Sequence, residues 1–268
     1  MSVHVSVTGL LPWIDARRLL GPGDWTFDGP TARADLAIHA AADLDARLHN
    51  VAIGGSPIRV ECRPPLPRPA VRAARTTDAR RRRDATPGFL RPGVRLDEEG
   101  RVSLTPEAIA AEIGRRYAGR TVIDAGCGAG GNAIGFARAG CRVIAVERDA
   151  GRLADARHNA RIYEVLDRIE LVPGDAVEVA ARRASPEAVL YVDPPWGVDW
   201  ARSGMGLEAL PLLEAFVQHG IFARYGTVLL KVPPSFRAGE IEGARPEAVY
   251  GLSAGDSRRV KFLLVTRA

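Results

Sequence analysis

The stretch VIDAGCGAGGN (residues 122–132) joins an apolar run to a glycine-rich turn and then to a helical pattern. An apolar run that stops at glycine is typical of a buried strand followed by a tight turn. Gly126 and Gly128 allow the backbone to approach a ligand closely, and the amides that open the next helix point at the same place. The stretch therefore predicts a strand, a ligand-binding loop and a helix. Its G-x-G-x-G-G spacing differs from the G-x-G-x-x-G dinucleotide fingerprint, although a glycine loop alone does not decide between ligands.

Acidic residues end three successive predicted strands, and together they discriminate between ligands. Asp124 precedes the glycines, where its carboxylate can receive the cationic amino group of a methionine moiety. Glu147 ends the next strand, where a carboxylate can accept hydrogen bonds from both ribose hydroxyls. Asp175 closes the strand after that and can accept a hydrogen bond from an adenine amino group. Helix capping would explain any one of these acids, but three acids in register fit S-adenosylmethionine better than NAD.

Strand and helix patterns alternate on both sides of the loop. The predicted strands are 121–126, 141–147, 169–176, 188–195 and 227–233, and the predicted helices are 105–117, 130–140, 150–165 and 207–226. Thr105 is the predicted N-cap of the first helix, with Pro106 at its first position. Short connections between alternating elements predict an α/β, Rossmann-like sheet of the class I methyltransferase type over 94–268, mostly parallel and covered on both faces. Two closing strands, at 247–251 and 258–267, would add one antiparallel edge strand.

The fourth strand ends in Asp193-Pro194-Pro195-Trp196, the [N/D/S]-P-P-[Y/F/W] arrangement of methyltransferases that act on amino nitrogens of planar rings. Such a nitrogen is a poor nucleophile because its lone pair is delocalised into the ring. An oxygen of residue 193 and the backbone carbonyl beside it can accept both N–H groups and hold the nitrogen in line for transfer. The prolines fix the direction of that carbonyl and donate no competing N–H. Trp196 offers a face for stacking, worth about 1–3 kcal/mol. These four are the candidate catalytic residues.

The chain before residue 94 divides into two parts. Residues 1–65 show the order strand, helix, strand, strand, helix, strand, which predicts a small α+β module with a ferredoxin-like layout similar to an RNA-recognition motif. Its first and third strands carry no Phe or Tyr on which bases could stack, so RNA binding by another face and a purely structural role both stay open. Residues 66–93 are rich in proline and arginine and predict a linker, with a short helix around 69–83.

Positive charge is concentrated in residues 63–95. This window holds ten arginines against Asp78 and Asp84, a local charge of +8 in a chain whose net charge is +5. A basic segment on a near-neutral body is typical of a protein that binds a polyanion, because arginines displace counterions from phosphates. The window therefore predicts RNA as a partner. A solvated linker in an arginine-rich chain is the alternative.

Other sequence features bear on location and metals. No run approaches the roughly 18 apolar residues of a membrane span, and the N-terminus lacks a basic start followed by an apolar signal segment. Cys62, Cys127 and Cys141 are scattered and form no C-x-x-C pair, which suits a reducing cytoplasm and argues against a structural zinc. We therefore expect a soluble cytoplasmic protein without a membrane segment or a metal. The pattern gives no oligomeric state.

Three segments resemble the catalytic domain of the trimethylguanosine synthase family, the RNA-cap guanine-N2 methyltransferases. They are GVRLDEEGRVSLTPEAIAAEI (93–113), the segment from VIDAG to PGDA (122–176) and DPPWG (193–197). The distinctive pieces are G-x-R-L-D with S-x-T-P-E, the G-G-N that ends at Asn132, the R-x-N-A-x-x-Y helix and P-P-W-G. The resemblance implies S-adenosylmethionine as cofactor and Trp196 as the residue on which the base stacks. The expected cofactor-binding residues are Thr105, Asp124, Gly126, Gly128, Asn132, Glu147, Asp175 and Asp193.

The chain also departs from this family. The family usually has serine where Asp193 stands, an aromatic pair where Arg101 and Val102 stand, and a W-G-G-P turn where residues 196–199 read Trp-Gly-Val-Asp. These regions would hold a capped nucleotide, so the resemblance favours the type of reaction over the cap substrate. Five further basic residues are candidates either for phosphate binding or for solvated surface: Arg224, Lys231, Arg237, Arg258 and Arg259.

The sequence therefore predicts an S-adenosylmethionine-dependent N-methyltransferase that acts on guanine N2 in RNA. Methylation of a small nucleotide, of another amino-bearing heterocycle or of adenine N6 would need the same residues. A non-enzymatic RNA-binding scaffold on a methyltransferase fold is the third alternative. It is disfavoured because the cofactor acids and the acceptor motif are both present.

Overall fold

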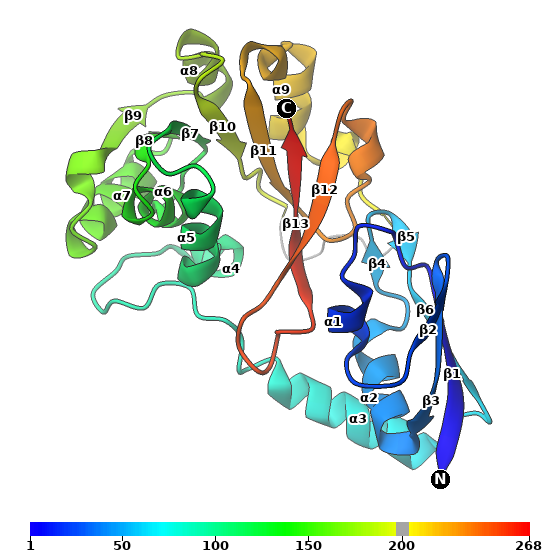
Figure 1. The fold of residues 1–268 in the computed structure, drawn as a ribbon. Coiled ribbons are helices and arrows are strands. Elements are labelled where there is room, and N and C mark those ends of the chain that lie inside the picture. The colour runs from blue at the N-terminus through cyan, green and yellow to red at the C-terminus, as the bar shows by residue number, and fades with distance from the viewer. Residues whose placement is uncertain (197–203) are drawn as a thin grey trace.

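The computed structural model describes residues 1–196 and 204–268, apart from the side chains of residues 99 and 102. Seven strands form its central sheet (Figure 1). Their order is β12-β13-β11-β10-β7-β8-β9. The bounds are β7 Thr121–Ala125, β8 Arg142–Glu147, β9 Ile169–Pro173, β10 Val189–Val192, β11 Thr227–Val232, β12 Arg245–Tyr250 and β13 Val260–Arg267. Neighbours from β9 to β11 are parallel, which confirms the predicted mostly parallel sheet. The carboxyl ends of these strands consequently share one edge.

The antiparallel strand does not lie at the edge of the sheet, so that part of the prediction is wrong. β13 pairs antiparallel with β11 on one side and with β12 on the other, and β12 is the edge strand. The physical reason lies in the two sequences. β13 carries a continuous apolar run at 262–265 that is buried throughout, as an inner strand requires, whereas β12 alternates exposed or half-buried residues and carries Arg245 and Glu247.

Helices cover both faces of this sheet (Figure 1). α5 (Glu107–Arg115), α6 (Gly131–Arg138) and α7 (Ala150–Ile162) contribute to one apolar cluster, while α8 (Ala176–Arg182) and α9 (Pro211–Gln218) contribute to the other. The single helix predicted over 207–226 is instead split into a 3-10 turn at 207–209, α9 and a second 3-10 turn at 221–224. Pro211 opens α9 and Gly220, with a left-handed backbone, follows its end, so both breaks occur at residues that interrupt helices.

α5 begins one residue later than predicted. Its N-cap position is Pro106, and Thr105 makes no capping hydrogen bond, so the prediction of Thr105 as the N-cap is wrong. The backbone N–H of Glu107 donates to the carbonyl of Gly88 instead, at 3.0 Å. A donor of the first turn is thus satisfied by a neighbouring segment, and Thr105 is left free to turn inwards, where it is 2% exposed.

The first 63 residues form a second, four-stranded antiparallel sheet in the order β2-β3-β1-β6. Its strands are β1 Ser2–Thr8, β2 Thr26–Asp28, β3 Thr31–Ala37 and β6 Arg59–Arg63, accompanied by α1 (Ala16–Leu20), α2 (Ile38–Leu48) and a small ribbon of β4 (Ala52–Ile53) and β5 (Ser56–Pro57). This strand order is that of a split β-α-β layout. The outer face of β1 and β3 is polar, and His4 and Asp35 hydrogen-bond across it at 3.0 Å.

This N-terminal sheet shares an apolar core with the central sheet and is also joined to it by polar contacts. The buried guanidinium of Arg47 donates to the carbonyls of Leu19 and Arg258, and the Tyr250 hydroxyl donates to the Asp15 carbonyl at 3.1 Å. Removing the first 90 residues would expose this shared core. A test of RNA binding by the N-terminal part therefore needs point substitutions rather than truncation.

α3 (Arg68–Arg81) is the helix predicted within the basic segment, and it packs against α2 (Figure 1). Its Ala74 and Asp78 are buried, and the Asp78 carboxylate pairs with both Arg82 and Arg259. The chain then runs through α4 (Glu98–Ser103), which the sequence did not predict, towards the carboxyl edge of the central sheet. No helix in the described ranges is long and apolar enough to cross a bilayer.

Candidate functional site

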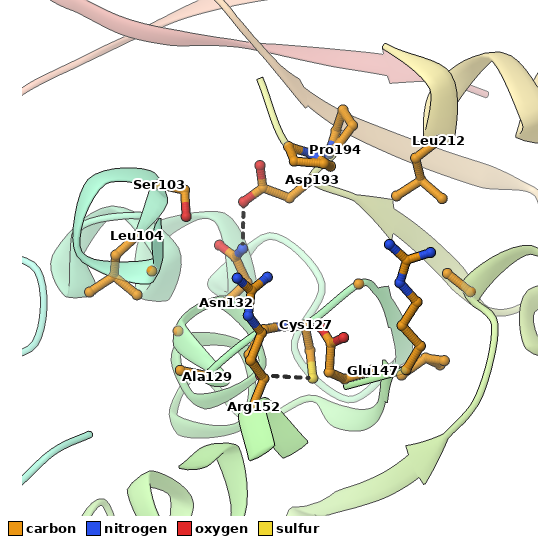
Figure 2. A pocket seen from close by; sticks show the side chains of 18 of the residues that line it. Ser103, Leu104, Cys127, Ala129, Asn132, Glu147, Arg152, Asp193, Pro194 and Leu212 are labelled. Atoms are coloured by element: carbon orange, nitrogen blue, oxygen red, sulfur yellow. Dashed lines mark hydrogen bonds between the residues drawn. The ribbon is translucent and has the colours of Figure 1, made fainter. Parts of the chain in front are cut away.

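A cavity of about 500 Å³ opens beside the glycine loop, at the carboxyl edge of the central sheet (Figure 2). Seven of the eight predicted cofactor-binding residues line it: Thr105, Gly126, Gly128, Asn132, Glu147, Asp175 and Asp193. Pro194 and Pro195 of the acceptor motif line it as well. The tertiary structure thus brings together residues that are almost 90 positions apart in the chain.

The glycine loop needs its glycines for two separate reasons. Gly126 and Gly128 have positive φ angles of 90° and 53°, a backbone region that residues with a side chain rarely adopt. Gly131, the first residue of α6, has an ordinary backbone, but a Cβ there would lie 2.2 Å from a methyl carbon of Leu104. The loop therefore turns tightly at two positions and lets the residue after α4 pack directly on the start of α6.

The Glu147 carboxylate is held in place by two backbone amides. Oε2 accepts a hydrogen bond from the N–H of Gly128 at 3.0 Å, and Oε1 accepts one from the N–H of Asp149 at 2.9 Å. Each carboxylate oxygen can accept more than one hydrogen bond. Glu147 consequently keeps acceptor capacity towards the cavity, as a contact with two ribose hydroxyls requires.

Asp175 caps a helix. Its Oδ1 accepts hydrogen bonds from the N–H groups of Val177 and Glu178 at 2.9 and 3.1 Å, at the start of α8. Helix capping, the alternative to cofactor binding for this acid, is therefore observed. The same exposed side chain also lines the cavity. The two roles are compatible because a carboxylate has two oxygens.

Asp124 lies behind the cavity wall rather than in it. Its side chain is fully buried, and within the described part of the chain neither carboxylate oxygen has a hydrogen-bond partner. Burial and the neighbouring Asp193 carboxylate raise the pKa of Asp124 to about 8. A buried carboxylate without a partner is costly, so this position favours a cation nearby. The ammonium of a methionine moiety supplies such a charge, and the donor set of the cavity fits S-adenosylmethionine.

Asp193 is the centre of a buried hydrogen-bond network. Its Oδ2 accepts from Asn132 Nδ2 at 3.0 Å, the bond drawn in Figure 2, and from Lys231 Nζ at 2.8 Å. The Tyr191 hydroxyl donates to Asn132 Oδ1 at 3.3 Å, and Lys231 also donates to the Ser103 carbonyl at 2.8 Å. Asn132, predicted as a cofactor contact, lines the cavity and at the same time holds Asp193.

Sequence reasoning named Lys231 as a candidate for phosphate binding or for solvated surface, and it missed the contact of this residue with Asp193. Solvated surface was one of its two expected roles, but its side chain is only 3% exposed and is directed at Asp193. Two signals pointed to burial: the residue interrupts the apolar strand TVLLKVP, and it is one of two lysines among 37 basic residues. A phosphate-binding residue is expected at the surface, where this chain uses arginine for nearly all of its basic residues.

A second cavity, of about 220 Å³, adjoins the first, because Ser103 and Leu104 line both. Trp196 lines this cavity, and Lys231 Nζ lies 5.7 Å from the centroid of its ring system. The other lining residues are Thr86, Gly88, Arg101, Pro106, Lys231, Lys261 and Phe262. Residues 197–199 of the family turn and Trp200 lie outside the described residues. Nowhere in the described ranges do three or more metal-ligating side chains cluster.

The strand order, the cavity at the glycine loop and the acids at three strand ends define a class I methyltransferase, the class that uses S-adenosylmethionine. Within that class the chain is similar to trimethylguanosine synthase. Residues 119–205 match the family model described as RNA cap guanine-N2 methyltransferase. Trimethylguanosine synthase of Schizosaccharomyces pombe is 33% identical over 113 residues, which are 39% of this chain and 47% of that protein. These matches confirm the family resemblance.

Ribosomal RNA small subunit methyltransferase J of Hydrogenovibrio crunogenus is 37% identical over 84 residues, 28% of this chain and 30% of that protein. The matched segment thus spans less than half the length of either curated relative. Among solved structures, a "putative methyltransferase" from Porphyromonas gingivalis W83 superposes with a TM-score of 0.50 at 17% identity, over 74% of this chain and 50% of that one. This likeness supports the fold.

Proposed function

We propose that the protein transfers a methyl group from S-adenosylmethionine to the exocyclic N2 of guanine in RNA. The observation that carries the proposal is the position of Asp193, which lines the cofactor cavity and is tied through Lys231 to the adjoining cavity that Trp196 lines. The cofactor supplies an electrophilic methyl group, and the acceptor nitrogen gives up one proton in exchange. The residues of this chain bind both partners and orient the nitrogen.

The cofactor-binding roles follow from the geometry of each acid. Glu147 would accept hydrogen bonds from the ribose hydroxyls, and Asp175 would accept one from the adenine amino group through the oxygen that the helix cap leaves unused. Asp124 would balance the ammonium of the methionine part from behind the wall. Gly126 and Gly128 would expose backbone to the cofactor.

Guanine suits Asp193 better than adenine does. Oδ2 is already engaged by Asn132 and Lys231, whereas Oδ1 has no partner within the described part of the chain. Guanine presents the N1–H donor beside its N2 amino group, so the free oxygen Oδ1 that accepts from the amino group is also attracted by the neighbouring donor. Adenine presents a lone pair at N1 next to its amino group, which a carboxylate repels. The acceptor chemistry therefore favours guanine N2 over adenine N6.

RNA is the proposed polymer, and we further propose that residues 1–65 and the basic segment 66–93 serve to hold it while 94–268 carries out the transfer. α3 leads into the segment at 86–104 that lines the second cavity, so its exposed arginines lie along a route towards the acceptor site. The polar outer face of the N-terminal sheet lacks stacking aromatics on β1 and β3, which favours backbone contacts over base recognition there. A cytoplasmic location is part of this proposal.

Methyl transfer from labelled S-adenosylmethionine to defined acceptors tests the function. The acceptors are ribosomal RNA of the small subunit, capped RNA and free guanine nucleotides, each followed by nucleoside analysis. We expect label in N2-methylguanosine from RNA. Label in N6-methyladenosine, or only in free nucleotides, would replace the proposal with one of the alternatives. A protein that binds S-adenosylmethionine but labels none of these acceptors would contradict it.

Substituting Trp196 with alanine is expected to raise the KM for the RNA about 5- to 100-fold, the equivalent of one lost stacking contact. The effect should fall on KM more than on kcat, because the two hydrogen bonds to Asp193 Oδ2 come from Asn132 and Lys231 and not from the indole ring. Trp196→Phe keeps an aromatic face and serves as the matched control. An unchanged KM in the alanine variant would show that the base does not stack on Trp196.

Neutralising the exposed arginines of α3 is expected to weaken RNA binding without changing cofactor binding. Arg68, Arg72 and Arg75 are exposed and form no ion pair within the described ranges. Their triple substitution to glutamine should reduce the slope of log affinity against log salt by about 2, because roughly 0.7 counterions are released per phosphate contact on a single strand. The control triple, Arg157, Arg161 and Arg168 to glutamine, removes the same exposed charge near the end of α7. Equal losses in both triples would assign the effect to net charge alone.

A further inference from the structure

We propose that Lys231 is a positioning residue: its ammonium fixes which oxygen of the Asp193 carboxylate faces the acceptor nitrogen, and it balances the negative charge buried at the end of β10. This inference rests on the proposed function, since it concerns the same acceptor site. It assigns a role to a residue that neither the cofactor signature nor the acceptor motif contains.

The ammonium is held on several sides. Nζ donates to Asp193 Oδ2 and to the Ser103 carbonyl, both at 2.8 Å, and it lies 5.7 and 5.5 Å from the ring centroids of Trp196 and Phe262. Two of its three N–H donors are therefore engaged, and aromatic faces stand near the charge. One bond reaches Asp193 just after β10, in the wall of the first cavity, and the other reaches Ser103 at the end of α4, which lines both cavities.

The choice of lysine supports a specific role. The chain uses arginine for 35 of its 37 basic residues, and Lys231 is one of the two exceptions. An ammonium is a compact charge that fits between a carboxylate, a carbonyl and two rings, whereas a guanidinium is a wide planar fork. Lys261, the other exception, pairs with Asp256 at 3.1 Å. Lys231 is thus the lysine whose ammonium donates to Asp193 of the acceptor motif.

The Asp124 and Asp193 carboxylates lie near each other and require a positive charge beside them. Asp124 and Asp193 lie close enough that the carboxylate of Asp193 raises the pKa of Asp124, while Lys231 lowers it. When both groups are ionised, two carboxylates in a poorly hydrated site repel each other unless a positive charge lies nearby. Lys231 supplies that charge within the protein itself, before any cofactor binds.

The network also selects a single orientation of Asp193. The two oxygens of a carboxylate are equivalent, so a half-turn of the group exchanges them. Because Asn132 and Lys231 both donate to Oδ2, that oxygen is engaged and Oδ1 is left for the acceptor amino group. Without the ammonium the carboxylate is held by one amide and can turn, and misorientation of the acceptor lowers the rate of transfer.

Charge and orientation can be separated by pairing Lys231→Met with Asp193→Asn. In Asp193→Asn alone, the two donors would draw the amide oxygen of residue 193 towards themselves, so that its NH₂ group faces the acceptor. In Lys231→Met alone, the carboxylate loses its counter-charge and one of its two anchors. In the double variant the neutral amide needs no counter-charge, and it can turn its oxygen towards the acceptor if the Asn132 amide also turns.

We expect each single variant to lower kcat on RNA about 100-fold, and the double variant to be at least about 10-fold faster than either, as coupled residues in one network allow. S-adenosylmethionine affinity, measured by calorimetry, should stay within about threefold in Lys231→Met, because the glycine loop and Glu147 are untouched. Arg116→Met, which removes a surface ion pair with Glu247, is the matched control for loss of a paired cation.

Urea unfolding of the unmodified protein, the two single variants and the double variant gives a readout that does not depend on turnover. The midpoint should fall in Lys231→Met and recover in the double variant. A kcat in Lys231→Met within threefold of the unmodified protein, or losses that simply multiply in the double variant, would overturn the inference. If the unmodified protein labels no RNA, the proposed function fails, and coupling in the urea midpoints then tests the Lys231–Asp193 pairing by itself.

Discussion

Replacing Asp193 with alanine should lower methyl transfer by about 10³-fold, the loss expected when a group that aligns and stabilises the reacting atoms is removed. Oδ1 is the oxygen of Asp193 that neither Asn132 nor Lys231 engages, so it is the acceptor available to the amino group. Binding of S-adenosylmethionine should persist, because Glu147 and Asp175 hold their own positions through backbone amides. Turnover and calorimetric cofactor binding, measured on the same preparation, check both parts.

The same substitution should also destabilise the fold. Lys231 is 2% exposed, and without Asp193 the Ser103 carbonyl is the one hydrogen-bond partner that its ammonium keeps among the residues that the structure describes. Removing one partner of a buried ion pair typically costs about 3–5 kcal/mol of unfolding free energy. A drop in activity could therefore reflect either chemistry or unfolding.

The double variant Asp193→Ala/Lys231→Met separates these two effects. Removing both charges should restore the urea midpoint, since no unpaired ammonium remains, but it should not restore turnover. A double variant that regained both would show that the carboxylate acts only through stability. A normal rate in Asp193→Ala alone would show that another group positions the amino nitrogen.

Replacing Asp124 with asparagine should weaken S-adenosylmethionine binding about 10- to 100-fold, the range that corresponds to one lost charge-assisted interaction. The side chain is fully buried and its carboxylate has no hydrogen-bond partner in the described part of the chain. Asparagine keeps the shape and removes the charge. The apo protein should consequently become more stable near pH 8, because an unpaired buried charge is gone. Asp167→Asn, at an exposed position, is the control.

The affinity for S-adenosylmethionine should also depend on pH, and the raised pKa of Asp124 determines the direction of that change. Burial and the Asp193 carboxylate raise the pKa of Asp124 to about 8. Below that pH the group is protonated in the apo protein, so binding of an ammonium must release the proton. Affinity should therefore rise with pH up to about 8, by up to roughly tenfold per pH unit, and Asp124→Asn should flatten this rise.

The contribution of Asp124 to the stability of the apo protein should fall as the pH rises, whereas the affinity for the cofactor rises. The pKa of Asp124 in the folded state lies above its value in the unfolded chain, so the folded state binds the proton more tightly. Its contribution to stability is fully present below about pH 4 and is lost progressively as the pH rises to about 8. Thermal unfolding of the unmodified protein and of Asp124→Asn between pH 5 and 8 measures the difference. Identical pH profiles for the two proteins would contradict the raised pKa.

Much of the fold could be predicted because its signals are local. Apolar runs marked the parallel strands, most of them with glycine or proline just beyond, and the helix in the basic segment was visible from its own residues. The predicted edge position of the antiparallel strand was wrong because the continuous apolar run of β13 is buried between β11 and β12, and the more polar β12 forms the edge. The N-cap at Thr105 was wrong because Gly88, seventeen or more residues earlier, supplies the contact that the cap would have made.

The sequence by itself determined the class of fold and the candidate cofactor residues, because acids at the ends of parallel strands share one edge of a sheet whatever the side-chain details. The roles of those residues stay proposals. Only the tertiary structure decided that Asp124 lies behind the cavity wall, that Asn132 and Lys231 hold Asp193, and that a second cavity adjoins the first. These features depend on atoms brought within 3 Å of one another from positions 38 and 61 residues apart, and periodicity carries no information about such contacts.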